Sequence, residues 1–162
     1  MRLARKLTAA LGIAAILALP GAARAQDREA PYWASISASR AYMRTGPGRN
    51  YPASWLYRRA GLPIRVVEIY ENWRKVEDPD GATGWMLVNL LSSERTAMVR
   101  GEIRAMHAEP SDAARIVYRV EPGVSGRVRR CGEGWCELDV LGRRGYIRTA
   151  HLWGVDANER IR

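Results

Sequence analysis

The chain has 162 residues, of which 47% are hydrophobic, and a formal net charge of +9 at neutral pH. This hydrophobic content excludes an intrinsically disordered polyampholyte, and two cysteines are too few for a disulfide framework or a four-thiolate zinc site. The positive charge favours anionic envelope polymers or lipid headgroups as partners, through a weak attraction that salt screens.

The first 25 residues have the pattern of a secretory signal peptide. A basic start over 1–6 precedes an apolar stretch over 7–18, which is too short to span a bilayer. Ala23-Arg24-Ala25 fits a small-x-small cleavage site, so we predict cleavage after Ala25 and a periplasmic or secreted mature protein. An uncleaved anchor or a buried N-terminal helix is the alternative interpretation. No later apolar run has the length of a membrane-spanning helix, so we predict no transmembrane segment in the mature chain.

Beyond this leader the chain repeats itself at a spacing of about 62 residues. The anchors of the repeat are turn glycines, aromatic residues and a terminal leucine that recur in the same order. They are Met43, Pro47, Tyr57, Gly61, Trp73, Gly84, Trp85 and Leu91 in the first copy and Met106, Pro110, Tyr118, Gly123, Trp135, Gly145, Tyr146 and Leu152 in the second. An ordered set of this length indicates two copies of one small domain. We predict domains over 33–96 and 99–155, followed by a C-terminal tail over 156–162.

Each copy has the pattern of short β-strands joined by turns. The predicted strands are 64–69, 73–77 and 83–88 in the first copy and 135–140 and 145–148 in the second, and each copy ends in a predicted 3₁₀ turn, at 89–91 and 150–152. Asp78-Pro79-Asp80-Gly81 is a turn sequence, because proline fixes φ and glycine accepts a positive φ. No helical periodicity longer than two turns follows residue 26. About five short strands in some sixty residues predict a small, strongly bent β-barrel.

The connector over 92–100 contains no proline or glycine and includes Met98 and Val99. This composition predicts a short strand or an ordered connector, and therefore two domains that pack as a fixed pair. Tyr32 and Trp33 before the first copy, and Trp153 and Val155 after the last leucine, are apolar residues that can cover the seam between the domains.

The motifs of the first copy resemble the bacterial SH3-like (SH3b) domain family. They are M-R-T-G-P with a following tyrosine, a G-x-x-x-x-V strand, N-W-x-x-V, D-G-x-x-G-W and a terminal leucine, over 41–91. The second copy matches from Gly123 onward and lacks the R-x-G-P portion. P-Y-W-A-S before the first copy and W-C-x-x-x-V in the second resemble an exported tandem-repeat protein of alphaproteobacterial type. The resemblance implies an all-β fold of two tandem small SH3-like β-barrels and a module that binds cell-wall peptide or glycan.

Four aromatic residues occupy equivalent strand positions in the two copies. They are Trp73, Trp85, Trp135 and Tyr146. We predict that these large rings form the structural core, with direct ligand contact as the alternative.

The first copy holds more aromatic side chains than one small barrel can bury. Exposed rings beside arginines suit stacking on sugars or peptides and charge-assisted contacts with carboxylates. We predict a ligand groove there, with packing against the second domain and ordinary exposure as alternatives. A second interpretation of Arg44 is that it hydrogen-bonds carbonyls of the following loop. The predicted ligand-binding residues are Tyr42, Arg44, Tyr51, Trp55, Tyr57 and Arg58.

Cys131 and Cys136 flank a glycine-rich turn, and we predict that they form a disulfide in an oxidising compartment. If Trp73 is equivalent to Trp135, the two cysteines oppose each other at a hairpin end, with Cα atoms about 4.5–5.5 Å apart. Redox catalysis and zinc binding are the alternatives. The spacing is not C-x-x-C, and His107 and His151 are the only other soft metal ligands.

The sequence carries no recognisable catalytic, cofactor or nucleic-acid motif. It contains no G-x-S-x-G, H-E-x-x-H or glycine-rich phosphate loop, and its clustered carboxylates fall in the turn at 78–81. We therefore predict no enzyme, no cofactor, no metal and no nucleic-acid partner. The predicted function is an exported module that recognises a cell-envelope component such as peptidoglycan peptide or glycan. A protein–protein adaptor in the envelope and an accessory or regulatory subunit of a cell-wall enzyme are the alternatives.

Overall fold

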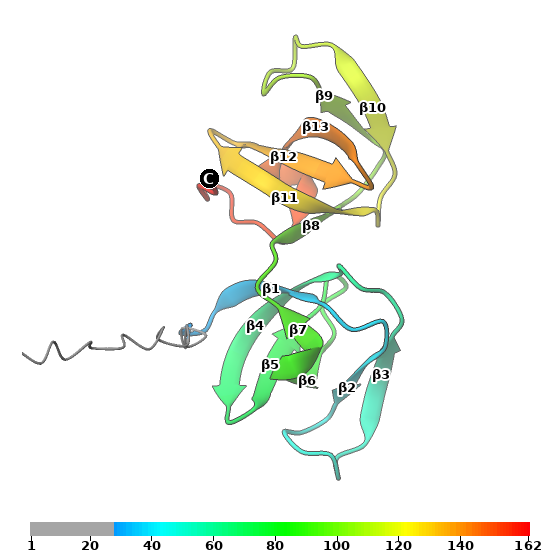
Figure 1. The fold of residues 1–162 in the computed structure, drawn as a ribbon, viewed down its shortest axis with the longest axis vertical. Helices are drawn as coiled ribbons and strands as arrows, with labels where there is room; N and C mark the ends of the chain where they lie inside the picture. Colours follow the sequence, from blue (N-terminus) through cyan, green and yellow to red (C-terminus); the bar gives the residue numbers. More distant parts are fainter. Residues whose placement is uncertain (1–27) are drawn as a thin grey trace, which may run out of the picture.

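A computed structural model describes residues 28–162, in which two β-sheets follow each other along the chain (Figure 1). The all-β fold with two tandem small domains is confirmed. The predicted signal peptide and its cleavage site lie outside the described residues. Among residues 28–162, no helix has the length and apolar character that crossing a bilayer requires.

Each sheet contains seven strands. Those of the first are β1 (Tyr32–Ile36), β2 (Ala41–Arg44), β3 (Ala53–Tyr57), β4 (Pro63–Tyr70), β5 (Trp73–Glu77), β6 (Thr83–Leu87) and β7 (Leu91–Ser92). Those of the second are β8 (Thr96–Val99), β9 (Arg104–His107), β10 (Ile116–Val120), β11 (Ser125–Gly132), β12 (Trp135–Val140), β13 (Arg143–Arg148) and β14 (Leu152–Trp153).

The two sheets have the same strand order, so the two copies of the sequence repeat fold in the same way. The orders are β3-β2-β6-β5-β4-β1-β7 and β10-β9-β13-β12-β11-β8-β14. The predicted 3₁₀ turns are present as η1 (Val88–Leu90) and η2 (Thr149–His151), each one residue earlier than expected. The shift arises because Leu91 and Leu152 are already extended and pair with β1 and β8.

Each domain has its own apolar core. Val66, Val76 and Met86 are buried in the first core, and Leu138 and Ile147 are buried in the second. A single cluster does not run through both domains, so each sheet curls around its own set of apolar side chains.

The two domains meet at a seam that β1 and β14 form with the connector. The rings of Trp33 and Trp153 lie 5.0 Å apart and nearly perpendicular. Ser35 Oγ donates a hydrogen bond of 2.9 Å to the Glu94 carbonyl, and Met98 packs against the first core. The connector itself is strand β8, which pairs with β11 and β14 of the second sheet. Of the seam residues named from the sequence, Trp33 and Trp153 are in contact, whereas Tyr32 packs on the first core and Val155 on the second.

Candidate ligand-binding face

Strand alternation gives β5 and β6 an inner face and an outer face. Val76 and Met86 point into the core. Trp73, Lys75 and Trp85 lie on the opposite face, because side chains alternate along each strand and Lys75 is paired directly with Trp85. The second domain repeats this arrangement, with Leu138 and Ile147 inside. Its outer face carries the other two aromatic residues expected in the core, Trp135 and Tyr146.

The four aromatic residues lie on the side of the sheets opposite the two apolar clusters, yet three of them are buried, as a core role requires. The fourth, Tyr146, is half-buried. In the second domain Trp135 is covered by the His107 ring, whose centroid is 5.6 Å away, and by the Arg148 guanidinium at 4.6 Å. Such contacts explain how an outward-pointing indole ring becomes buried.

A continuous band of rings and cations crosses the outer face of the first domain. Arg44 is the β2 partner of Trp85 on β6, and its guanidinium lies 5.8 Å from the Tyr42 ring. Trp85 in turn packs edge-to-face with Tyr70, with centroids 6.4 Å apart. Tyr42 and Tyr70 are 42% and 51% exposed. We call this band, formed by Tyr42, Arg44, Tyr70, Lys75 and Trp85, the aromatic face.

The loop between β2 and β3 closes one end of the aromatic face. Arg44 Nη1 donates a hydrogen bond of 2.7 Å to the Tyr51 carbonyl, so the loop-bonding interpretation of Arg44 is confirmed. The Tyr51 ring lies against Gly46, where a β-carbon would overlap it. Arg44 therefore fixes the loop and also presents its charge on the same face.

Trp55 and Tyr57 lie on the other face of the β2–β3 hairpin, because they pair with Met43 and Ala41 and not with Tyr42. Trp55 is 58% exposed. Tyr57 is half-buried, and its hydroxyl donates a hydrogen bond of 2.7 Å to Asp78 Oδ2.

Burial and this hydrogen bond raise the pKa of Tyr57 above its usual range. Asp78 also accepts hydrogen bonds from the backbone N–H groups of Asp80 and Ala82, as its place in a turn suggests. Arg58 is exposed just after β3. The structure thus brings Tyr42, Arg44 and Tyr51 together and places the other three predicted residues elsewhere.

Tyr70 and Trp85 belong to the aromatic face but were not among the ligand residues expected from the sequence. The available signal was strand alternation across the tight β4–β5 connection, which pairs Tyr70 with Trp73 on the outer face. That signal is usable only when the register of both hairpins is known.

Cys131 and Cys136 form a disulfide, which confirms the predicted bond. They are directly opposed on β11 and β12, with Cα atoms 4.2 Å apart, and the equivalent pair in the first domain is Ile69 and Arg74. Both cysteines are buried in the second core. Within residues 28–162, no group of three or more histidine, cysteine, aspartate or glutamate side chains is placed to hold a metal ion.

Comparisons with known proteins address the family and the fold. A family profile described as "Bacterial SH3 domain" matches residues 37–92 and again residues 100–154. No curated protein gives a significant match.

Three solved structures show weak similarity. An NlpC/P60 family protein from Bacillus cereus is 14% identical, over 75% of this chain and 55% of that chain, with a TM-score of 0.34. NlpC1 and NlpC2 from Trichomonas vaginalis are 12% and 15% identical, over 78% of this chain and 46% and 49% of theirs, each with a TM-score of 0.35. The chain spans about half the length of these proteins.

Proposed function

The chain belongs to the bacterial SH3 domain family, and from this membership we propose that it is an exported, non-catalytic module that binds a component of the cell envelope. The proposed ligand is a peptide or glycan of the peptidoglycan. The observation that carries the proposal is the aromatic face, on which half-exposed Tyr42 lies beside Arg44 and half-exposed Tyr70 packs against Trp85.

The chemistry of this face suits a wall polymer. Tyr42 and Tyr70 offer ring surfaces with a hydroxyl at the edge, so they can contact an apolar sugar face or peptide side chain and still form hydrogen bonds. The guanidinium of Arg44 can form paired hydrogen bonds with a carboxylate, a group that peptide stems carry. Trp85 packs beneath Tyr70 and holds that ring in place.

The disulfide supports an extracytoplasmic location. Disulfides persist in oxidising compartments and are rare in reducing ones, and the Cys131–Cys136 bond lies inside the second core. A location outside the cytoplasm is where a ligand of the cell wall is available.

Pelleting on purified peptidoglycan sacculi tests the proposal. We expect mature protein to sediment with sacculi and to remain bound at about 0.5 M salt, because ring contacts are less sensitive to screening than exposed ion pairs. Tyr42→Ala and Tyr70→Ala should each weaken binding at least about tenfold, as expected of central aromatic contacts.

Tyr118→Ala is the matched control, since Tyr118 is a 40% exposed tyrosine on β10 of the other domain. Failure to sediment, or equal loss in the control, would contradict the proposal. Near-ultraviolet circular dichroism of each variant checks that the fold is retained.

A second candidate function, a protein–protein adaptor, is favoured by Trp55. This residue is 58% exposed on β3, the terminal strand in the order of the first sheet. An open strand edge with an exposed ring accepts an extended segment of a partner by strand addition. A photocrosslinking residue at position 55 should then give one discrete adduct in cells, while the same residue at position 118 gives none. Sacculus binding unchanged by Trp55→Ala would separate the two functions.

A further inference from the structure

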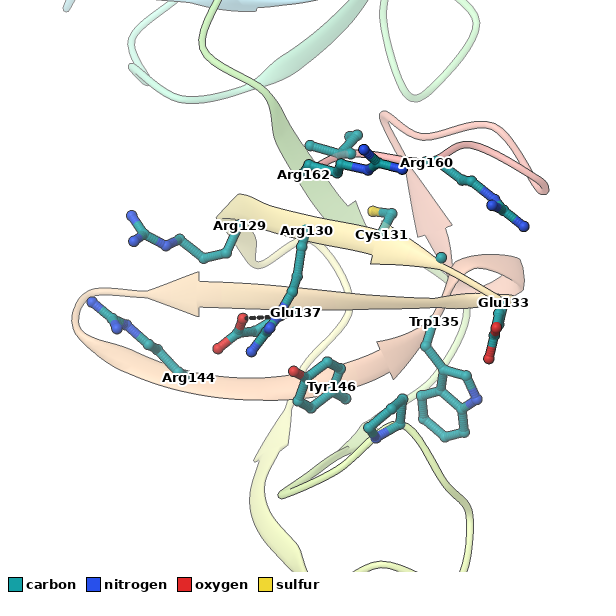
Figure 2. Close-up of a pocket in the computed structure, with 13 residues that line it drawn as sticks. Arg129, Arg130, Cys131, Glu133, Trp135, Glu137, Arg144, Tyr146, Arg160 and Arg162 are labelled. Carbon is teal, nitrogen blue, oxygen red and sulfur yellow. Dashed lines mark hydrogen bonds and ion pairs between the residues drawn. The ribbon is translucent and has the colours of Figure 1, made fainter.

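The outer face of the second domain forms an open groove of about 900 Å³ (Figure 2). It corresponds in position to the aromatic face, but its chemistry differs. Five arginines line it: Arg129, Arg130, Arg144, Arg160 and Arg162. Tyr146 and the edge of Trp135 form part of its floor, and we call it the arginine groove.

One wall of the arginine groove is built by residues 160–162, which belong to the segment predicted above only as a tail. Ile161 forms a two-way backbone pair with Cys131, with N–H···O distances of 2.9 and 3.1 Å, and its side chain packs on the second core. Arg160 and Arg162, on either side of Ile161, are held beside β11 by this pairing. The disulfide therefore fixes one strand of the floor and, through Cys131, the wall as well.

Ion pairs neutralise only part of the charge in the groove. Arg130 pairs with Glu137 at 2.8 Å, and Arg144 pairs with Asp139 at 3.0 Å. Among residues 28–162, the arginines of the groove that make no ion pair are Arg129, Arg160 and Arg162. These three come from two separate segments and surround one cavity, so their fields add at its centre.

We propose that the arginine groove binds an acidic glycan, with carboxylates spaced along a chain of neutral sugar hydroxyls. Arginine forks pair with carboxylates bidentately, which suits the three unpaired guanidinium groups. Glu133 and Glu137 line the same groove. Their carboxylates can accept hydrogen bonds from the neutral hydroxyls between the acidic groups of such a glycan.

The floor of the groove is consistent with a sugar ligand. Tyr146 is half-buried beneath the Arg130 guanidinium, which lies 5.6 Å from the ring centroid. A ring surface beside a guanidinium offers both an apolar contact and hydrogen-bond donors, which is the combination that a sugar carboxylate uses. This site goes beyond the proposed function, which assigns wall binding to the first domain.

Titration calorimetry with the mature protein and polygalacturonate oligomers tests the proposal. We expect binding that weakens with salt and no binding of neutral dextran. Arg160→Gln combined with Arg162→Gln should weaken binding at least about tenfold. Arg115→Gln combined with Arg119→Gln is the control, because it removes the same amount of charge from two exposed residues. Arg115 lies just before β10 and Arg119 lies within β10. This double substitution should change the affinity less than about twofold.

Several outcomes would overturn the arginine groove as a glycan site. Equal losses in the two double variants would show non-specific attraction by net charge, and polyglutamate binding as tight as polygalacturonate binding would show that no sugar is recognised. Hydrogen exchange at the Ile161 amide checks that the wall of the groove stays in place in the variants. Polygalacturonate binding that persists in protein that does not sediment with sacculi would support this site and contradict the proposed function, so the two proposals are distinguishable.

Discussion

Gly84 lies where β6 passes closest to β2. A β-carbon there would be 2.6 Å from Met43 Cγ and 2.7 Å from the Arg44 carbonyl oxygen, and the second of these atoms is backbone that cannot turn aside. Gly84→Ala should therefore lower the free energy of unfolding by about 1–3 kcal/mol, as overpacking does. Denaturant unfolding measures the change. Gly132→Ala is the control, because a β-carbon at Gly132 would have no neighbouring atom within 4 Å, and a comparable loss there would contradict overpacking as the cause.

Tyr57 connects β3 to the turn after β5 through its hydrogen bond to Asp78. Removing the hydroxyl in Tyr57→Phe should cost about 1 kcal/mol of stability at neutral pH. Because burial and Asp78 raise the pKa of Tyr57 in the folded protein, folding favours the protonated phenol. The contribution of Tyr57 is then complete below its unfolded pKa of about 10 and is lost as the pH rises toward the folded pKa.

Unfolding curves of the wild type and Tyr57→Phe at neutral pH and above pH 10 check this sign. The stability difference between the two proteins should shrink as the pH rises. A difference that grows with pH would show that Tyr57 is not held in its protonated form.

The β11–β12 hairpin carries a disulfide that its counterpart in the first domain lacks. Ile69 and Arg74 stand where the cysteines stand, and the β4–β5 hairpin forms without a covalent link. Reduction should thus lower the stability of the second domain by about 2 kcal/mol without abolishing folding, which is the size expected for a short loop. Thiol titration of denatured, non-reduced protein should find no free thiol. Two titratable thiols, or complete unfolding on reduction, would argue against this role.

The β2–β3 hairpin shows which features of a strand pair could be predicted from the sequence and which could not. Turn residues and alternation located the β5–β6 and β12–β13 hairpins, and the resemblance to the SH3b family was confirmed. The face of the β2–β3 hairpin that carries Trp55 could not be predicted from turn residues and alternation. The register shifts at a bulge between Met43 and Arg44, and no residue pattern marks that bulge in the sequence. A shift of one residue in the pairing of β3 with β2 moves each β3 side chain to the opposite face of the hairpin. Trp55 and Tyr57 therefore lie on the face opposite Tyr42 and Arg44.

The attachment of the C-terminal segment 156–162 to the second domain could not be predicted from the sequence either. Ile161 is its one strongly apolar residue near the end, and the segment is attached by the bridge from Ile161 to Cys131 and by the ion pair between Arg95 and Glu159. Isolated contacts of this kind leave no periodic pattern in the sequence. The arginine groove, whose wall this segment forms, could therefore not be inferred before the structure.

The seam couples the two domains through Trp33 and Trp153. An edge-to-face pair of this kind contributes about 0.5–1.5 kcal/mol beyond the burial of its area. A double-mutant cycle with Trp33→Ala and Trp153→Ala should give a coupling free energy in that range. Limited proteolysis should cut slowly between Ser92 and Gly101 in the wild type and faster in either variant. Rapid cleavage of the wild type into two stable halves would show that the domains are independent.

A fixed seam would also determine how the aromatic face and the arginine groove act on a polymer that carries a ligand for each of them. Once a chain is held on one domain, its second contact becomes intramolecular, and the effective concentration of that contact depends on the distance between the faces and not on a linker. Avidity should then appear abruptly at the polymer length that first spans both faces. The affinity of the two-domain protein would then depend on the length of the ligand as well as on the chemistry of the ligand.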